Sequence, residues 1–153
     1  MILVTGPKGV LGSALCRDRR CEAWHVLLEE PYYQSLRLVT VDAAILCAGR
    51  KGFYECDGND DVFRADVDGN ISLAKQLMHH GVFVVFLSTE AVERTGHRAA
   101  YSSNRLLVEQ FLWTQENNAI IRPRRFDSVN VGGLADLCIK VATEKLSGIH
   151  YWP

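Results

Sequence analysis

The sequence predicts an α/β protein whose doubly wound parallel β-sheet is covered by helices on both faces, giving three layers. Short runs of four to six apolar residues alternate with segments in which apolar residues recur at helical spacing. The apolar runs are continuous, which is typical of parallel strands buried on both faces. Three closely spaced glycines, Gly6, Gly9 and Gly12, separate the first strand from the first helix.

The first half of the chain alternates strands and helices in this way. Apolar runs predict three strands, and helical spacing predicts two helices. The strands are residues 2–5, 24–28 and 43–48, and the helices are residues 10–20 and 60–80. Asn59 is the expected N-cap of the second helix, and Gly81 ends it.

The segments between these elements are less regular. Residues 32–41 fit neither period, and a third strand expected between Glu30 and Val41 is reduced or lost. Residues 50–59 are expected to form a loop. The acidic cluster over residues 55–68 is interpreted as the start of a helix rather than as a metal site, and we expect no metal.

The second half continues the alternation. Residues 82–87 give the strongest strand signal in the chain. The elements that follow are a helix at 102–116, a strand at 119–122, a helix at 134–146 capped by Gly148, and a short strand at 149–152.

Composition limits the function classes. A length of 153 residues predicts one domain, residues 1–153, without a separate substrate domain. Seventeen basic and eighteen acidic residues give a net charge of −1, so we expect no nucleic-acid or membrane partner. Five cysteines without a C-x-x-C pair predict free thiols in a reducing, cytoplasmic setting.

The glycine turn predicts a dinucleotide-binding site. Glycines at these positions permit a tight turn, close approach of a pyrophosphate to the backbone, and contact between helix and strand. Lys8, Val10 and Leu11 lie within the same turn, so residues 6–12 are expected to hold the cofactor. The turn is no P-loop, because it lacks the Gly-Lys-Ser/Thr ending.

The choice of cofactor depends on an acid near the second strand. Glu29 and Glu30 follow Gly12 by 17 and 18 residues, and an acid there binds the adenosine ribose hydroxyls and repels a 2′-phosphate. This favours NAD. Two surface acids at a strand end are the alternative interpretation, and Lys8 would favour a phosphate, so NADP stays open.

The order of the motifs resembles the extended short-chain dehydrogenase/reductase superfamily, above all its sugar-nucleotide branch and the dTDP-4-dehydrorhamnose reductases. The resemblance spans nearly the whole chain and implies a Rossmann fold that binds NAD(P). The blocks that carry it are Val-Thr-Gly-x-x-Gly-x-x-Gly (4–12), Cys-Ala-Gly (47–49), Asp-Val-Asp-Gly-Asn (66–70), Ser-Thr-Glu-Ala-Val (88–92), Tyr-x-x-x-Arg-x-x-x-Glu (101–109), Ile-Arg-Pro (121–123) and Leu-Ala-Asp-Leu (134–137).

The resemblance also implies catalytic roles. Tyr101 is the expected acid/base and Thr89 the group that polarises the substrate carbonyl. Arg105, in place of the family lysine, would hold the nicotinamide ribose, and Ala48 and Gly49 would lie beside the cofactor. Tyr101 and Arg105 are four residues apart on one helix, so both share a face, and a cation there would stabilise a phenolate.

In relatives, the helix after residue 60 and the Tyr101 helix pair across a two-fold axis, so we expect a homodimer. In this chain both helices carry enough apolar residues to cover more than one face: Phe63, Ile71, Leu106, Phe111 and Trp113.

Three departures keep two functions open. Arg105 replaces the lysine and has Glu109 as an i+4 partner that could neutralise it. Asp66 replaces an asparagine of the proton relay, and the chain is short after Pro123. The first function is an NAD(P)-dependent oxidoreductase acting on a carbonyl or hydroxyl of a small molecule, for which a nucleotide sugar is a candidate. The second is a non-catalytic dinucleotide-binding sensor or scaffold with a degenerate site.

Overall fold

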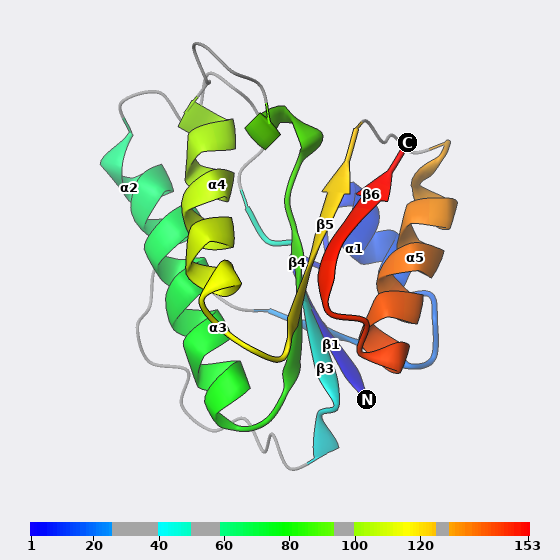
Figure 1. Cartoon of the computed structure of the whole chain (residues 1–153). Coiled ribbons are helices and arrows are strands. Elements are labelled where there is room, and N and C mark those ends of the chain that lie inside the picture. Colours follow the sequence, from blue (N-terminus) through cyan, green and yellow to red (C-terminus); the bar gives the residue numbers. More distant parts are fainter. Residues whose placement is uncertain (26–39, 50–58, 94–99, 125–128) are drawn as a thin grey trace.

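The computed structural model describes residues 1–25, 40–49, 59–93, 100–124 and 129–153 (Figure 1). It confirms the predicted α/β class. Six strands form one parallel sheet in the order β2-β1-β3-β4-β5-β6. The strands are β1 (Ile2–Thr5), β2 (Cys21–Trp24), β3 (Ala43–Leu46), β4 (Phe83–Leu87), β5 (Asn118–Pro123) and β6 (Gly148–Trp152). Because all six run in one direction, their carboxyl ends meet at one edge, the upper edge in Figure 1.

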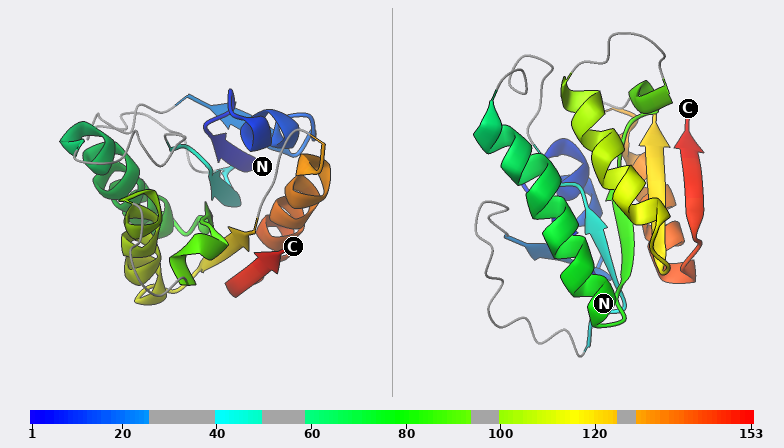
Figure 2. Two further views of the ribbon diagram at one scale, coloured as in Figure 1. Left: turned by 90° about the horizontal axis from the view of Figure 1, so that it is seen from above. Right: turned by 60° about the vertical axis from the view of Figure 1, so that its left-hand side comes forward.

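Helices lie on both faces of this sheet, as the sequence predicts. The helical elements are α1 (Val10–Leu15), α2 (Asp60–Phe63), the π-helical η2 (Arg64–Gly69), α3 (Asn70–His79), the 3₁₀ turn η3 (Glu90–Glu93), α4 (Ala100–Trp113) and α5 (Val131–Glu144). The helices α2, α3 and α4 cover one face, and α1 and α5 cover the other (Figure 2).

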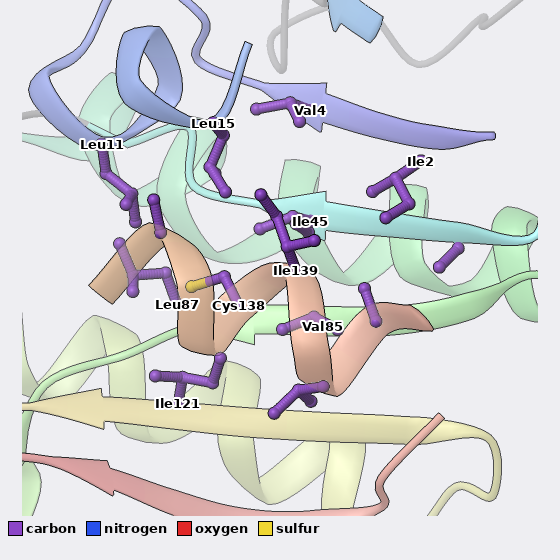
Figure 3. Packing of buried hydrophobic residues seen from close by; sticks show 14 of the residues in the cluster. Ile2, Val4, Leu11, Leu15, Ile45, Val85, Leu87, Ile121, Cys138 and Ile139 are labelled. Carbon is purple, nitrogen blue, oxygen red and sulfur yellow. The ribbon is translucent and has the colours of Figure 1, made fainter. Parts of the chain in front are cut away.

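Alternate strand residues supply two separate apolar layers. Ile2 and Val4 of β1 pack with α1 and α5, whereas Leu3 between them packs with α3 and α4. Figure 3 shows the first layer, in which Cys138 and Ile139 of α5 lie against the strands. Burial on both faces explains why the strands appear in the sequence as continuous apolar runs.

The first helix and the second strand both end earlier than predicted. The helix α1 ends at Leu15 instead of continuing to residue 20. The carboxylate of Asp18 accepts hydrogen bonds from the backbone N–H and from Nε of Arg20, both 2.9 Å long, and so fixes a turn after the helix. The strand β2 then occupies Cys21–Trp24 rather than 24–28, of which residues 26–28 lie outside the described part.

The position of β2 in the sheet explains this error. In the described part of the chain, β2 is an edge strand that pairs only with β1, and its two central residues, Glu22 and Ala23, are exposed. Such a strand leaves no continuous apolar run in the sequence. Most of the region expected to hold the reduced third strand lies outside the described residues.

The predicted helix at 60–80 is confirmed as an unbroken helical stretch from Asp60 to His79. The side chain of Asn59 caps it, accepting hydrogen bonds from the backbone N–H groups of Asp61 and Val62, each 3.2 Å long. The middle of the stretch, η2, is wound as a π-helix, which the apolar spacing did not reveal.

The last two helices begin earlier than predicted. The helix α4 spans Ala100–Trp113 rather than 102–116, and α5 spans Val131–Glu144 rather than 134–146. Gly148 is not the cap of α5. Lys145 ends that helix in the left-handed conformation, with φ 52°, while Gly148 opens β6 with φ 104°. No helix in the described ranges is long and apolar enough to cross a bilayer.

Candidate functional site

The glycine turn lies at the carboxyl edge of the sheet and packs tightly on itself. Gly6 has φ 64°, and a Cβ atom there would lie 2.9 Å from Cα of Ala48. A Cβ atom on Gly12 would lie 2.1 Å from the carbonyl oxygen of Gly6. Neither position accepts a side chain without movement of backbone. The turn is therefore folded against itself and against the segment after β3.

Thr5, which sequence reasoning did not single out, ties the ends of β1 and β3 together. Its hydroxyl oxygen accepts hydrogen bonds from the backbone N–H groups of Cys47 (3.1 Å) and Ala48 (3.0 Å). The Cys47 thiol donates to the carbonyl oxygen of Thr5 at 2.9 Å, and burial raises the pKa of this thiol to about 12. The sequence signal that could have identified Thr5 is a hydroxyl residue immediately before the first glycine of the turn.

The other predicted turn residues differ in what they present to a ligand. Lys8 is exposed, whereas the side chain of Leu11 is buried in the layer beneath α5. Gly9 opens α1, its backbone N–H donating to the carbonyl oxygen of Gly6 at 3.0 Å. Val10 is half-buried. Leu11 can therefore meet a ligand only through its backbone.

Arg105 lies between Tyr101 and Gly49 at this edge of the sheet. The guanidinium carbon of Arg105 lies 5.3 Å from the ring centroid of Tyr101 and 5.4 Å from that of Phe86 in β4. A Cβ atom on Gly49 would lie 2.1 Å from Nη2 of Arg105. The Arg105 side chain of α4 thus reaches across to Gly49, three residues after the end of β3.

The expectation that Glu109 could neutralise Arg105 is wrong. The fully buried carboxylate of Glu109 accepts two hydrogen bonds from Arg122 of β5, at 3.1 Å from Nε and 2.5 Å from Nη2. These bonds raise the pKa of the Arg122 guanidinium above its ordinary value. Glu109 and Arg105 share a helix, but tertiary packing gives the acid to a different cation.

Arg122 is the centre of a larger cluster at the same end of the sheet. Its Nη1 donates to Oε1 of Glu93 in η3 at 2.6 Å and to the hydroxyl of Tyr151 in β6 at 3.1 Å. The Tyr151 hydroxyl also donates to Glu93. The cluster joins α4, β5, η3 and β6, and so holds the segment after β4 against the helix that carries Tyr101.

Thr89 lies at the same edge as Gly49. Leu46 and Phe86 are paired across β3 and β4, and Gly49 and Thr89 each follow their strand residue by three positions. The Thr89 hydroxyl oxygen accepts a hydrogen bond from the backbone N–H of Ala91 at 3.2 Å, which starts η3.

Two further predicted residues, Glu29 and Asp66, are not among the residues placed at this edge. Glu29 lies outside the described residues, and because β2 ends at Trp24, His25 is the residue that follows this strand. Asp66, in η2, is 2% exposed, and its carbonyl oxygen accepts a hydrogen bond from Nδ2 of Asn70 at 2.9 Å.

A parallel sheet with a glycine turn at its carboxyl edge is the Rossmann type of α/β fold. The solved structures that share it include sugar-nucleotide enzymes. A hypothetical dTDP-4-dehydrorhamnose reductase from Sulfolobus tokodaii superposes with a TM-score of 0.81 at 16% identity, covering 98% of this chain and 75% of the other. The dTDP-4-dehydrorhamnose reductase from Bacillus anthracis, in complex with NADP, gives 0.82 at 15% identity, with 98% and 73% covered.

A third structure matches over a shorter span. The enzyme WbmG from Bordetella bronchiseptica, in complex with NAD and UDP, gives a TM-score of 0.62 at 16% identity, covering 80% of this chain and 52% of that one. No protein-family model and no curated protein matches the sequence. These structures confirm the fold that the ordered motifs indicated.

Proposed function

We propose that this chain binds a nicotinamide dinucleotide along the carboxyl edge of its sheet and acts as an NAD(P)-dependent oxidoreductase of the short-chain dehydrogenase/reductase kind. The observation that carries the proposal is the meeting of Tyr101, Arg105 and Gly49 at the edge where the glycine turn lies. The substrate would be a carbonyl or hydroxyl compound, and a nucleotide sugar is the candidate class because the similar structures include enzymes of that chemistry.

The residues present fit such a cofactor. The turn over residues 6–12 presents backbone at the carboxyl edge, where this fold takes a pyrophosphate. Ala48 and Gly49 continue that surface beside Gly6. Similar structures in complex with NADP and with NAD support the same class of ligand here. The preference for NAD over NADP rests on Glu29 and remains part of the proposal.

The catalytic roles follow from the positions of three side chains. When bound, the cofactor supplies or accepts the hydride. In the reducing direction Tyr101 donates its phenolic proton to the substrate oxygen, and the Arg105 guanidinium against its ring stabilises the phenolate left behind. Thr89 keeps its hydroxyl hydrogen for the substrate oxygen, because its bond with Ala91 uses only the oxygen lone pair.

Tyr101→Phe tests the catalytic role. The substitution removes one oxygen and keeps the ring that Arg105 covers, so we expect dinucleotide affinity within about twofold of wild type and turnover lowered by about 10² or more. Calorimetric titration with NADH and NADPH measures the affinities, and a panel of nucleotide-sugar ketones measures turnover. Undiminished turnover in the variant would remove Tyr101 from the mechanism. The absence of binding of either dinucleotide at millimolar concentration would refute the cofactor proposal.

Asp66 favours the second function, a non-catalytic dinucleotide-binding sensor or scaffold. It replaces the asparagine of the family relay and is almost fully buried in the π-helical segment. Asp66→Asn separates the two functions. An oxidoreductase damaged only by this departure would gain turnover, whereas a pure binding protein would show no turnover with either residue and would still bind the dinucleotide.

We also propose a homodimer formed through α2, α3 and α4. Phe63 of α2 and Leu107 of α4 are each 40% exposed, and Trp113 at the end of α4 is 52% exposed. Large apolar residues exposed on neighbouring helices are typical of an interface between subunits.

A further inference from the structure

The guanidinium of Arg105 forms no ion pair within the part of the chain that the structure describes. The residue is 5% exposed, and its Nε and Nη1 atoms are buried without a hydrogen-bond partner. The acid on the same helix that stands four residues away, Glu109, is taken by Arg122. An arginine side chain keeps its positive charge in a protein, so burial does not neutralise it.

Such an arrangement is unfavourable for the protein alone. A buried charge requires an opposite charge and hydrogen bonds to its donors, and lacking them it destabilises the fold. The rings of Tyr101 and Phe86 offset part of the penalty through their π faces. The N–H groups at the rim of the guanidinium plane stay unsatisfied, and only an acceptor in that plane can satisfy them.

The location of these donors points to a ligand. Nη2 fits against Gly49 only because that residue has no side chain, and Gly49 follows Ala48, which packs on Gly6 of the glycine turn. The Nη2 end of the guanidinium therefore lies beside the surface proposed for the dinucleotide and its substrate, and the unpartnered Nε and Nη1 belong to the same plane. Phe86 and Tyr101 fix the guanidinium there before any ligand arrives.

We propose that Arg105 is a receptor for an oxyanion, a phosphate or carboxylate group carried by the ligand of this site. The inference rests on the proposed function and deepens it. The family lysine at this position implies uncharged ribose hydroxyls as partners, and hydroxyls would satisfy donors without compensating the buried charge. The planar fork of arginine matches the two oxygens of a carboxylate or phosphate.

Stability without ligand gives the first test. Arg105→Met keeps the unbranched apolar stem of the side chain as far as the position of Nε and removes the charged guanidinium. We expect the melting temperature of the ligand-free protein to rise by about 2 °C or more. The exposed Arg124, at the same edge of the sheet, provides the matched control, and Arg124→Met should leave melting unchanged. An unchanged or lower melting temperature for Arg105→Met would mean that the guanidinium serves the fold, and the proposal would be overturned.

Anion binding gives the second test. Melting is followed with inorganic phosphate, with oxamate and with chloride at matched ionic strength. We expect phosphate or oxamate to stabilise the wild type and Arg124→Met relative to chloride, and this stabilisation to vanish in Arg105→Met. Stabilisation by phosphate alone indicates a phosphate of the dinucleotide, and stabilisation by oxamate alone indicates a carboxylate of the substrate. An anion effect that persists in Arg105→Met, or none in the wild type, overturns the proposal.

A third measurement separates this inference from the proposed function. The same preparations are titrated with NADH and NADPH. Dinucleotide binding combined with an anion effect that does not depend on Arg105 rejects the oxyanion role and leaves the cofactor proposal standing. An Arg105-dependent anion effect without dinucleotide binding supports the oxyanion role and rejects the cofactor proposal.

Discussion

At the glycine turn, the choice of residue is limited by the backbone atoms that any side chain would meet. A methyl group on Gly12 meets the carbonyl oxygen of Gly6 at 2.1 Å, and the opposing atom belongs to a turn that is itself packed on Ala48. Movement at one glycine is therefore passed to the other and to the end of β3. The contacts explain why glycines at these two positions were a dependable sequence signal.

Gly12→Ala should destabilise the protein and abolish dinucleotide binding, because the turn must move to make room for the methyl group. Gly132→Ala in α5 is the matched control. Apart from its chain neighbours and the backbone of its own helix, no atom lies within 4 Å of the Cβ position there, so alanine should stabilise the helix by about 0.5–1 kcal/mol. Chemical denaturation and calorimetry on both variants measure these effects. A Gly12→Ala protein that binds the dinucleotide like wild type contradicts the proposed cofactor position.

The thiol of Cys47 is predicted to be unreactive in the folded protein. Burial raises its pKa to about 12, so at about pH 8 only about one thiol in 10⁴ is ionised, and the thiolate is the reactive form. The raised pKa also means that this thiol contributes stability below its ordinary value of 9.0, which is lost as the pH rises toward 12. Iodoacetamide labelling followed by peptide mass spectrometry should modify Cys47 in denaturant only. Rapid labelling of the native protein would show that the turn opens.

At the scale of elements, the cluster around Arg122 decides how α4 sits on the sheet. Glu109 and Arg122 are 13 residues apart on different elements, and the pair is almost completely buried. Glu93 and Tyr151 bring η3 and β6 to the same guanidinium. Four elements therefore depend on one side chain at the edge that carries Thr89 and Tyr101.

Arg122→Met should lower the free energy of unfolding by about 3–5 kcal/mol, because it leaves the Glu109 carboxylate buried without its partner. Adding Glu109→Leu should restore most of that loss, since the double variant buries no charge at this site. Arg20→Met, which breaks an exposed pair with Asp18, provides the control and should lower the free energy of unfolding by about 1 kcal/mol or less. Equal destabilisation by Arg122→Met and Arg20→Met would show that the buried cluster contributes no more to the free energy of unfolding than an exposed ion pair.

The sequence predicted the elements whose signals are local. Central strands buried on both faces gave continuous apolar runs, as in β4, and the Asn59 cap was visible because capping needs only three or four neighbouring residues. The edge strand β2 was misplaced, since half of it faces solvent and the turn at Asp18 that precedes it depends on side-chain contacts.

In the candidate site, too, local features were predicted and contacts between distant elements were not. The glycine turn was predicted from the spacing of its glycines, and Tyr101 and Arg105 from the family resemblance. The structure places the turn at the carboxyl edge of the sheet and Arg105 between Tyr101 and Gly49. The partner of Glu109 was wrong because i+4 spacing says nothing about a cation arriving from β5. Thr5 and Phe86 contribute through contacts between strands, which spacing along one element cannot reveal.

At the scale of the whole molecule, the exposed apolar residues on α2 and α4 predict self-association. Replacing Phe63 and Leu107 together by lysine removes two apolar contacts and adds like charges to both sides of a symmetric interface. We expect the wild type to sediment as a dimer and the double variant as a folded monomer. Replacing exposed Ile149 of β6 by lysine is the control and should leave the dimer intact. A monomeric wild type at high concentration contradicts the proposed homodimer.

The sheet is a wall between two apolar layers, and this has a consequence for how the protein can diverge. Because successive strand residues face opposite layers, a side chain replaced near α5 has no direct contact with the layer near α3. Changes in the two layers should add without interaction. Residues in one layer can then be replaced, with compensating changes of volume in the same layer, while the strands keep their register.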